Sequence, residues 1–172
     1  MTEISLFAIL STVILFSFIS IGIIRFGLQN SYSAYSIKWG NAVPINNMNL
    51  WSIVTIVAAF LLCPVMLELA SGSLLQFLGF LTPVYLIIVS LTPNWNEGGK
   101  VFVIHTIFAV LCMIGSLVWS IAIMHAVRVV AIIGIFYLTL ALLTGTYKTS
   151  VVFWIEMWLF VSTYLIVLMA IF

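Results

Sequence analysis

Six apolar stretches follow one another along the chain, and short polar segments separate them. About 20 apolar residues in a helix cross a hydrocarbon core that is roughly 30 Å thick. The stretches are apolar on every face, whereas a membrane β-strand alternates apolar and polar positions. The pattern therefore predicts an all-α, polytopic transmembrane helix bundle with six spans, at about residues 4–24, 50–70, 74–91, 101–123, 128–147 and 151–172.

The fourth and fifth spans lie within one apolar run, residues 101–147, which contains no proline. As a single helix this run would be about 70 Å long, more than twice the thickness of a bilayer. His125 and Arg128 interrupt it, with apolar residues on both sides. We therefore expect the chain to turn back between Met124 and Arg128.

The composition points to the same class of protein. Of 172 residues, 65% are hydrophobic and 5% are charged, whereas soluble domains carry about 25% charged residues. The net charge of +1 excludes the basic surface that a nucleic-acid-binding protein needs. Six spans leave no room for a separate soluble domain. We predict one transmembrane domain, residues 1–172, in the cell membrane, with residues 25–49 as its longest extramembrane segment.

An even number of spans places both termini on one side of the membrane. That side carries a single cationic side chain, Arg128. The opposite side holds the loops at residues 25–49, 92–100 and 147–150, and with them most of the cations. Positively charged loops favour the cytoplasmic side. The side predicted to be cytoplasmic therefore bears Arg25, Lys38, Lys100 and Lys148.

Aromatic residues gather at this same side. Tyr32, Tyr35 and Trp39 recur at spacings of three and four in the first loop, which predicts one face of a short interfacial helix and three candidate loop contacts. The alternative is that this loop is only an interfacial connector. Tryptophans near helix ends anchor them at headgroup depth. We expect such a belt from Trp39, Trp51, Trp95 and Trp154.

Ionisable side chains at membrane depth are costly, and by default they face the bundle interior and mark a functional site. Glu68, His105 and Glu156 lie within predicted spans. His105 and Glu156 share the leaflet next to the cationic side, whereas Glu68 lies in the other leaflet. Together with three side chains near helix ends, they form the predicted polar pocket: His105, Glu156, Glu68, Arg25, Arg128 and His125.

The fourth span has a face of small and polar residues on which His105 lies. Small residues mark close packing between membrane helices, so this face points into the bundle. A direct pair between His105 and Glu156 is one arrangement of the pocket. Such a pair either fixes the helix register or carries a proton. The residues that share the face of His105 are Ala109, Cys112, Ser116 and Ser120.

No motif points to metal or cofactor chemistry. The two cysteines, Cys63 and Cys112, lie mid-span without metal-ligand spacing, and we expect them to be small buried side chains. The sequence has no H-E-x-x-H motif and no nucleophile elbow. We therefore predict no metal and no cofactor, and an enzymatic role is not favoured.

The layout resembles a group of small membrane proteins. Its Ser-rich first loop (Ser31-Tyr32-Ser33-Ala34), a short Pro-bearing loop (Thr92-Pro93) and a His one turn into the fourth span (His105) are similar to those of six-span families of unknown function of the Frag1/DRAM type. The resemblance covers the layout of the whole chain. It implies that both termini are cytoplasmic, which is opposite to the orientation that the charges predict.

Three functions fit these observations. The most favoured is a non-catalytic membrane protein whose inward polar pocket binds lipid or a small amphiphile, or which serves as a subunit of a membrane assembly with another membrane protein or a second copy. The first alternative is a proton- or ion-coupled transporter or channel that uses His105 and Glu156. Transporters often contain an internal repeat, and none is evident here. The second alternative is a lipid-modifying enzyme, for which few polar groups converge.

Overall fold

The computed structural model describes residues 2–42, 44–45, 48–93, 95 and 99–172. Their fold is all-α, as predicted, apart from a minimal antiparallel pair of two-residue strands, β1 (Pro44–Ile45) and β2 (Met48–Asn49). Within the described residues the helices are α1 (Glu3–Phe26), α2 (Ala34–Ala42), α3 (Leu50–Leu69), α4 (Phe77–Ser90), α5 (Gly99–Val118), α6 (Val127–Leu143) and α7 (Val151–Ile171).

Six of these helices lie where the six spans were predicted. Four are long and apolar enough to cross a membrane: α1, α3, α7, and α5 with the π-helical turn Trp119–Ile123 that continues it. The other two, α4 and α6, are apolar but have only 14 and 17 residues. The structure is therefore compatible with a location in a membrane, with four helices of full spanning length.

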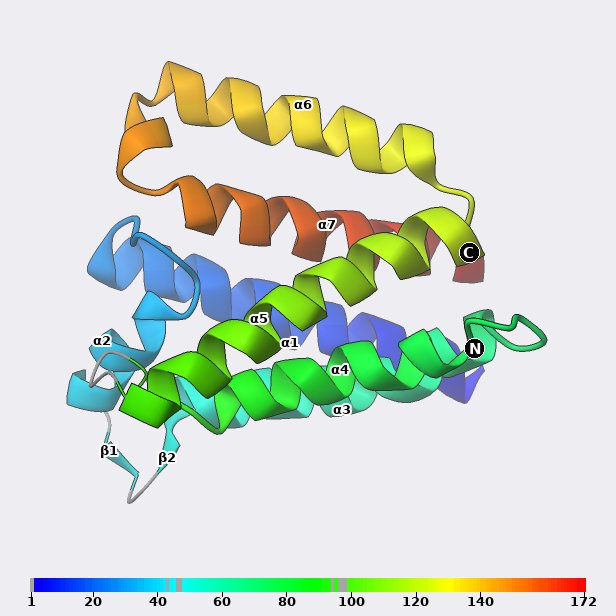
Figure 1. Cartoon of the computed structure of the whole chain (residues 1–172), viewed down its shortest axis with the longest axis horizontal. Helices are drawn as coiled ribbons and strands as arrows, with labels where there is room; N and C mark the ends of the chain where they lie inside the picture. Colours follow the sequence, from blue (N-terminus) through cyan, green and yellow to red (C-terminus); the bar gives the residue numbers. More distant parts are fainter. Residues whose placement is uncertain (1, 43, 46–47, 94, 96–98) are drawn as a thin grey trace.

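The long helices run side by side along one axis of the molecule (Figure 1). The two termini, the link between α3 and α4, and the turn between α5 and α6 lie at one end, which we call the terminal end. The opposite end, called the loop end, carries α2, the strand pair, the start of α5 and the link between α6 and α7. Successive long helices are therefore antiparallel, as the predicted order of spans requires.

The predicted turn between the fourth and fifth spans is confirmed. The π-helical turn Trp119–Ile123 ends the helix that starts as α5, and α6 begins at Val127. Between them His125 has a φ of 50°, in the left-handed region that non-glycine residues seldom adopt. The backbone N–H of Ala126 donates to the carbonyl of Ser120 at 3.1 Å. The apolar run is therefore broken by local backbone geometry and not by proline.

Small residues bring α3, α4 and α5 into close contact. A Cβ on Gly79 of α4 would lie 2.7 Å from the backbone oxygen of Met66 in α3. A Cβ on Gly115 of α5 would lie 2.5 Å from Oγ1 of Thr82 in α4. The predicted inward face of α5 is confirmed, because the side chains of this face that are buried include His105, Cys112, Ser116 and Ser120.

The first loop folds inward. The predicted short helix is present as α2, and Tyr32, Tyr35 and Trp39 are only 2%, 1% and 4% exposed, so their side chains pack into the bundle. Trp39 stacks on Phe18 of α1 with ring centroids 5.0 Å apart. Gly22 of α1 makes room, since a Cβ there would meet the ring of Tyr35 at 3.2 Å.

The four tryptophans expected to form a belt differ in burial. Trp39 and Trp51 are buried within the bundle, whereas Trp95 and Trp154 are half-buried. Trp51 packs against Tyr32, with ring centroids 5.3 Å apart. The first loop contributes to the burial of these indoles, and the spacing of residues along the chain does not predict such tertiary contacts.

Candidate functional site

A cavity of about 410 Å³ lies between α5 and α7, in the halves of these helices nearest the loop end. It arises because α5 crosses the bundle obliquely, from α4 at the loop end to α7 at the terminal end (Figure 1). We call it the α5–α7 pocket. Its lining residues are Asn30, Ser31, Ser33, Trp95, Phe102, His105, Thr106, Ala109, Val110, Met113, Val152 and Glu156.

Glu156 holds the first loop against α7. The backbone N–H of Tyr32 donates to Oε2 of Glu156 at 2.5 Å. The backbone N–H of Phe153, in the first turn of α7, donates to the carbonyl of Asn30 at 3.0 Å. First-turn N–H groups have no partner within their own helix, so Asn30 satisfies one of them. The chain before α2 is therefore fixed to α7 at two points one turn apart.

His105 holds the same loop against α5. Its Nε2 lies 3.0 Å from Oγ of Ser33, and its Nδ1 lies 2.9 Å from Oγ1 and 3.2 Å from the carbonyl oxygen of Thr92. A carbonyl oxygen can only accept, so this contact favours a proton on Nδ1 and leaves Nε2 to accept from the Ser33 hydroxyl. Both ring nitrogens of His105 therefore have partners.

Trp95 covers His105 from the side of the α4–α5 link. The two rings are stacked, with centroids 5.5 Å apart and an interplanar angle of 23°. The indole N–H of Trp95 donates to the carbonyl of Ser33 at 3.2 Å. His105 therefore bonds to the hydroxyl of Ser33, and Trp95 bonds to the carbonyl of Ser33.

The structure brings His105 and Glu156 to one pocket without pairing them. Within the described residues, the ring nitrogens of His105 bond to Thr92 and Ser33. The carboxylate of Glu156 accepts from the backbone amide of Tyr32 instead. The direct pair that the sequence suggested is thus replaced by a bridge through consecutive loop residues, Tyr32 and Ser33. The loop occupies the space between the two helices.

The other four residues predicted for the polar pocket lie elsewhere, so this part of the prediction was wrong. Glu68, His125 and Arg128 are exposed at the terminal end. Arg25 is exposed at the end of α1, where its guanidinium lies over the rings of Phe26 and Trp39 at 5.3 and 5.2 Å. Long charged side chains at helix ends reach outward to polar surroundings and do not enter the bundle.

The sequence did not mark three residues of the site. Trp95 was assigned to the aromatic belt, and Ser33 and Thr92 were noted only as parts of the layout. Their roles depend on contacts with His105, which is 72 residues from Ser33 and 13 from Thr92. The signal that could have linked Trp95 to the site is its position in a turn segment shortly before His105.

A second, smaller cavity of about 30 Å³ lies deeper, among α4, α5 and α7. This exceeds the roughly 10–15 Å³ that one water molecule requires. It shares Ser33, Ala109, Met113 and Glu156 with the α5–α7 pocket. Glu156 therefore lies between the outer pocket and the bundle interior.

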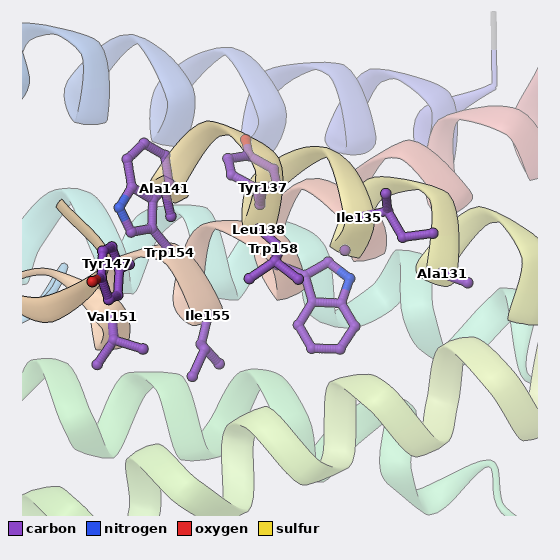
Figure 2. Close-up of a pocket in the computed structure, with 11 residues that line it drawn as sticks. Ala131, Ile135, Tyr137, Leu138, Ala141, Tyr147, Val151, Trp154, Ile155 and Trp158 are labelled. Carbon is purple, nitrogen blue, oxygen red and sulfur yellow. The ribbon is translucent and has the colours of Figure 1, made fainter. Parts of the chain in front are cut away.

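A third cavity, of about 410 Å³, lies between α6 and α7 and is almost wholly apolar (Figure 2). Two tryptophans of α7 form part of its wall. The indole N–H of Trp154 donates to Oγ1 of Thr146 at 2.9 Å, and that of Trp158 donates to the carbonyl of Val130 at 2.8 Å. Their polar atoms are thus occupied, and the cavity offers a ligand little besides carbon surface.

The described residues contain no group of three or more histidine, cysteine, aspartate or glutamate side chains that could hold a metal ion. Within the described part, Cys63 and Cys112 are free thiols. Outside the helices, burial raises the pKa of the Tyr32 phenol above its ordinary value. This hydroxyl lies 2.7 Å from Oγ1 of Thr55, so the neutral phenol of Tyr32 bonds the first loop to α3.

No protein-family model, curated protein or solved structure matches this chain. The function is therefore inferred from the chemistry of the pocket residues. That chemistry is a carboxylate, a histidine with both nitrogens bonded, and serine hydroxyls above an apolar wall.

Proposed function

We propose that this chain is a six-span membrane protein with a non-catalytic role, and that it binds a lipid or small amphiphile in the α5–α7 pocket. The observation that carries the proposal is the order of side chains along α5. His105 and Thr106 lie near the loop end of the pocket, and Ala109, Val110 and Met113 follow toward the middle of the helix. A polar end and an apolar wall match a headgroup and a chain.

The outward surfaces support a lipid environment. Ile132, Ile135 and Phe136 of α6 are 67%, 66% and 59% exposed. Large contiguous apolar surfaces are rare on soluble monomers. The shorter α4 and α6 each return the chain to the opposite end of the molecule (Figure 1), which supports their crossing the membrane as well. A helix with a short apolar stretch is accommodated by local thinning of the bilayer.

A non-catalytic role agrees with the state of His105. A general base needs a nitrogen within reach of the proton that it removes. Both nitrogens of His105 are bonded within the protein, to Ser33 and Thr92. His105 therefore acts in this proposal as a residue that positions the loop.

One observation favours a second candidate, proton- or ion-coupled transport. Glu156 lines both the outer pocket and the inner cavity, so a proton on its carboxyl group could pass between them. Transport predicts that Glu156→Gln abolishes a pH-driven flux in liposomes. A flux that survives this substitution, or no flux with the unaltered chain, removes the second candidate.

The proposal also covers the orientation of the chain in the membrane and its relationship to other membrane proteins. The cations Arg25, Lys38, Lys100 and Lys148 support a cytoplasmic loop end. The resemblance to families of the Frag1/DRAM type supports the opposite orientation. Labelling of the two ends separates these proposals.

Native mass spectrometry of the gently extracted particle tests the binding role. We expect a discrete, stoichiometric small mass bound to the unaltered chain. Thr106→Trp should remove it, because Thr106 is exposed and lines the pocket. Ile107→Trp is the matched control, since Ile107 is 51% exposed and is not among the lining residues.

Two outcomes contradict the proposal. One is the absence of any bound small mass, and the other is equal retention of that mass by Thr106→Trp and the unaltered chain. A co-purifying membrane protein in place of a small molecule would instead favour a role as an assembly subunit.

A further inference from the structure

We infer that the occupant of the α5–α7 pocket is a single-chain amphiphile with a positively charged amine headgroup. This rests on the proposed binding function and names the class of ligand. Three features of the site carry it: the carboxyl group of Glu156 without a cationic partner among the described residues, the oxygen acceptors beside it, and the size and polarity gradient of the cavity.

The carboxyl group of Glu156 has no cationic partner within the described part of the chain. Its Oε2 accepts from the Tyr32 amide, and no described lysine, arginine or histidine nitrogen forms an ion pair with it. The cations at the loop end do not line the pocket, and Arg25 is directed onto aromatic rings. A carboxylate removed from water is costly unless it is paired. A ligand ammonium group would supply that pair.

Oxygen atoms of the pocket can also accept from a donor headgroup. The Tyr32 amide already donates to Glu156, and both nitrogens of His105 are bonded within the protein. The hydroxyl oxygen of Ser33 keeps accepting capacity while it contacts His105. An ammonium group has three N–H donors and no acceptor, so it complements these oxygens. The ionised carboxylate of Glu156 would repel a phosphate or carboxylate headgroup.

The cavity fits one chain. Its volume of about 410 Å³ lies near the lower limit of the roughly 300–1,000 Å³ typical of small-molecule sites. From His105 to Met113 the wall extends about 12 Å along α5, from the polar end toward the middle of the bundle. The exposed side chains of Phe102, Val110 and Val152 border the opening. A chain would therefore enter sideways from the lipid, with its headgroup at the loop end.

Three probes with the same chain test the headgroup. Hexadecylamine, hexadecanol and hexadecanoic acid are added separately, near pH 7, to the full chain in a non-ionic maltoside detergent, and bound masses are titrated by native mass spectrometry. Alkylamines are protonated at this pH, as lysine is. We expect the amine to bind about tenfold or more tightly than the alcohol, and the acid to bind most weakly.

Substitutions then assign the selectivity to one carboxylate. Glu156→Gln should remove the preference for the amine over the alcohol, because the variant has no carboxylate to pair with the ammonium group. Glu68→Gln is the matched control, because Glu68 is exposed at the far end of the bundle, and it should keep the preference for the amine.

The outcomes distinguish failure of the headgroup inference from failure of the proposed binding function. Equal binding of amine and alcohol to the unaltered chain, both blocked by Thr106→Trp, overturns the headgroup inference and leaves the pocket standing. Tighter binding of the acid than of the amine also overturns it. Failure of all three probes to bind, or binding that Thr106→Trp does not affect, contradicts the proposed function itself. The comparison of headgroups on the unaltered chain requires no variant to fold.

Discussion

At the scale of single residues, Glu156 both holds the first loop and lines the α5–α7 pocket. One carboxylate oxygen accepts the Tyr32 amide, and the side chain also lines the pocket. An acidic side chain at membrane depth is expensive. Its retention is explained if it both satisfies a backbone group of the loop and faces a ligand.

Two substitutions of Glu156 should therefore differ in stability. In Glu156→Gln the amide oxygen can still accept from the Tyr32 N–H, so the free energy of unfolding should change little. Glu156→Ala leaves that N–H unpaired and should cost about 1–3 kcal/mol. Unfolding in maltoside micelles by titration with SDS measures both. Glu68→Ala, at an exposed carboxylate, is the control. Equal losses for the two Glu156 variants would contradict this role.

Tyr32 makes the stability depend on alkaline pH. Burial raises the pKa of its phenol, whereas in the unfolded chain the pKa is about 10. Below that pH both states keep the proton, and the contribution of Tyr32 to stability is complete. As the pH rises above about 10, the unfolded state loses its proton first, so stability falls by up to about 1.4 kcal/mol per pH unit.

The prediction is that Tyr32→Phe weakens this alkaline dependence. Phenylalanine also removes the hydrogen bond to Thr55, so the variant should be less stable at neutral pH. Between pH 10 and 11 its free energy of unfolding should nevertheless fall less steeply than that of the unaltered chain. The measurement is a series of SDS titrations from pH 8 to pH 11. Parallel curves for the two proteins would show that Tyr32 ionises in the folded state as easily as in the unfolded state.

At the scale of elements, side-chain hydrogen bonds fix the first loop to several parts of the bundle. The Ser36 hydroxyl donates to the carbonyl of Pro93 at 2.8 Å, and Nδ2 of Asn49 donates to the carbonyl of Ser36 at 2.8 Å. The phenol of Tyr35 donates to the carbonyl of Gly27 at 2.8 Å. These bonds connect α2 to the α4–α5 link, to the start of α3 and to the end of α1.

The contact between α3 and α4 depends on the absence of a side chain at Gly79. Gly79→Ala would place a Cβ 2.7 Å from the backbone oxygen of Met66, which cannot rotate away. We expect a loss of about 1–3 kcal/mol as the helices separate. Gly40→Ala is the matched control, since its Cβ would meet only the Asn49 side chain at 3.4 Å. A gain of about 0.5–1 kcal/mol is expected there, because alanine favours a helix over glycine. SDS titration compares the two, and equal effects would contradict the close packing.

At the scale of the whole molecule, the two ends differ in charge. The loop end carries the exposed side chains of Arg25, Lys38, Lys100 and Lys148, and the terminal end carries that of Arg128. Each of the six apolar helices carries the chain from one end of the molecule to the other (Figure 1). If a helix crosses the membrane, the links before and after it therefore lie on opposite sides.

Single cysteines in a chain with Cys63→Ala and Cys112→Ala provide that test. Ser71→Cys and His125→Cys should react with a membrane-impermeant maleimide on intact cells, whereas Lys100→Cys and Thr149→Cys should react only after lysis. All four positions are exposed. Ser71 and Lys100 on the same side would contradict a crossing by α4, and His125 and Thr149 on the same side would contradict one by α6. The reverse pattern keeps six spans and supports the orientation that the Frag1/DRAM-type resemblance implies.

Much of the fold could be predicted because local sequence specifies it. Apolar length placed the six apolar helices to within a few residues, with ends at 70 predicted against Leu69 and at 123 against Ile123. Helical spacing also identified the inward face on which His105 lies, since residues three or four apart share a face. Charges at helix ends were assigned to the correct ends of the molecule.

The site itself was decided by tertiary structure. The bond from the Tyr32 amide to Glu156 joins residues 124 apart, and the contact of Ser33 with His105 joins residues 72 apart. Helical periodicity carries no information about such pairs, because it describes one helix at a time. The sequence by itself determined that the chain forms apolar helices and which faces turn inward. Only the packing of the loop between α5 and α7 decided that His105 and Glu156 meet through that loop, and that the other predicted charges remain at the surface.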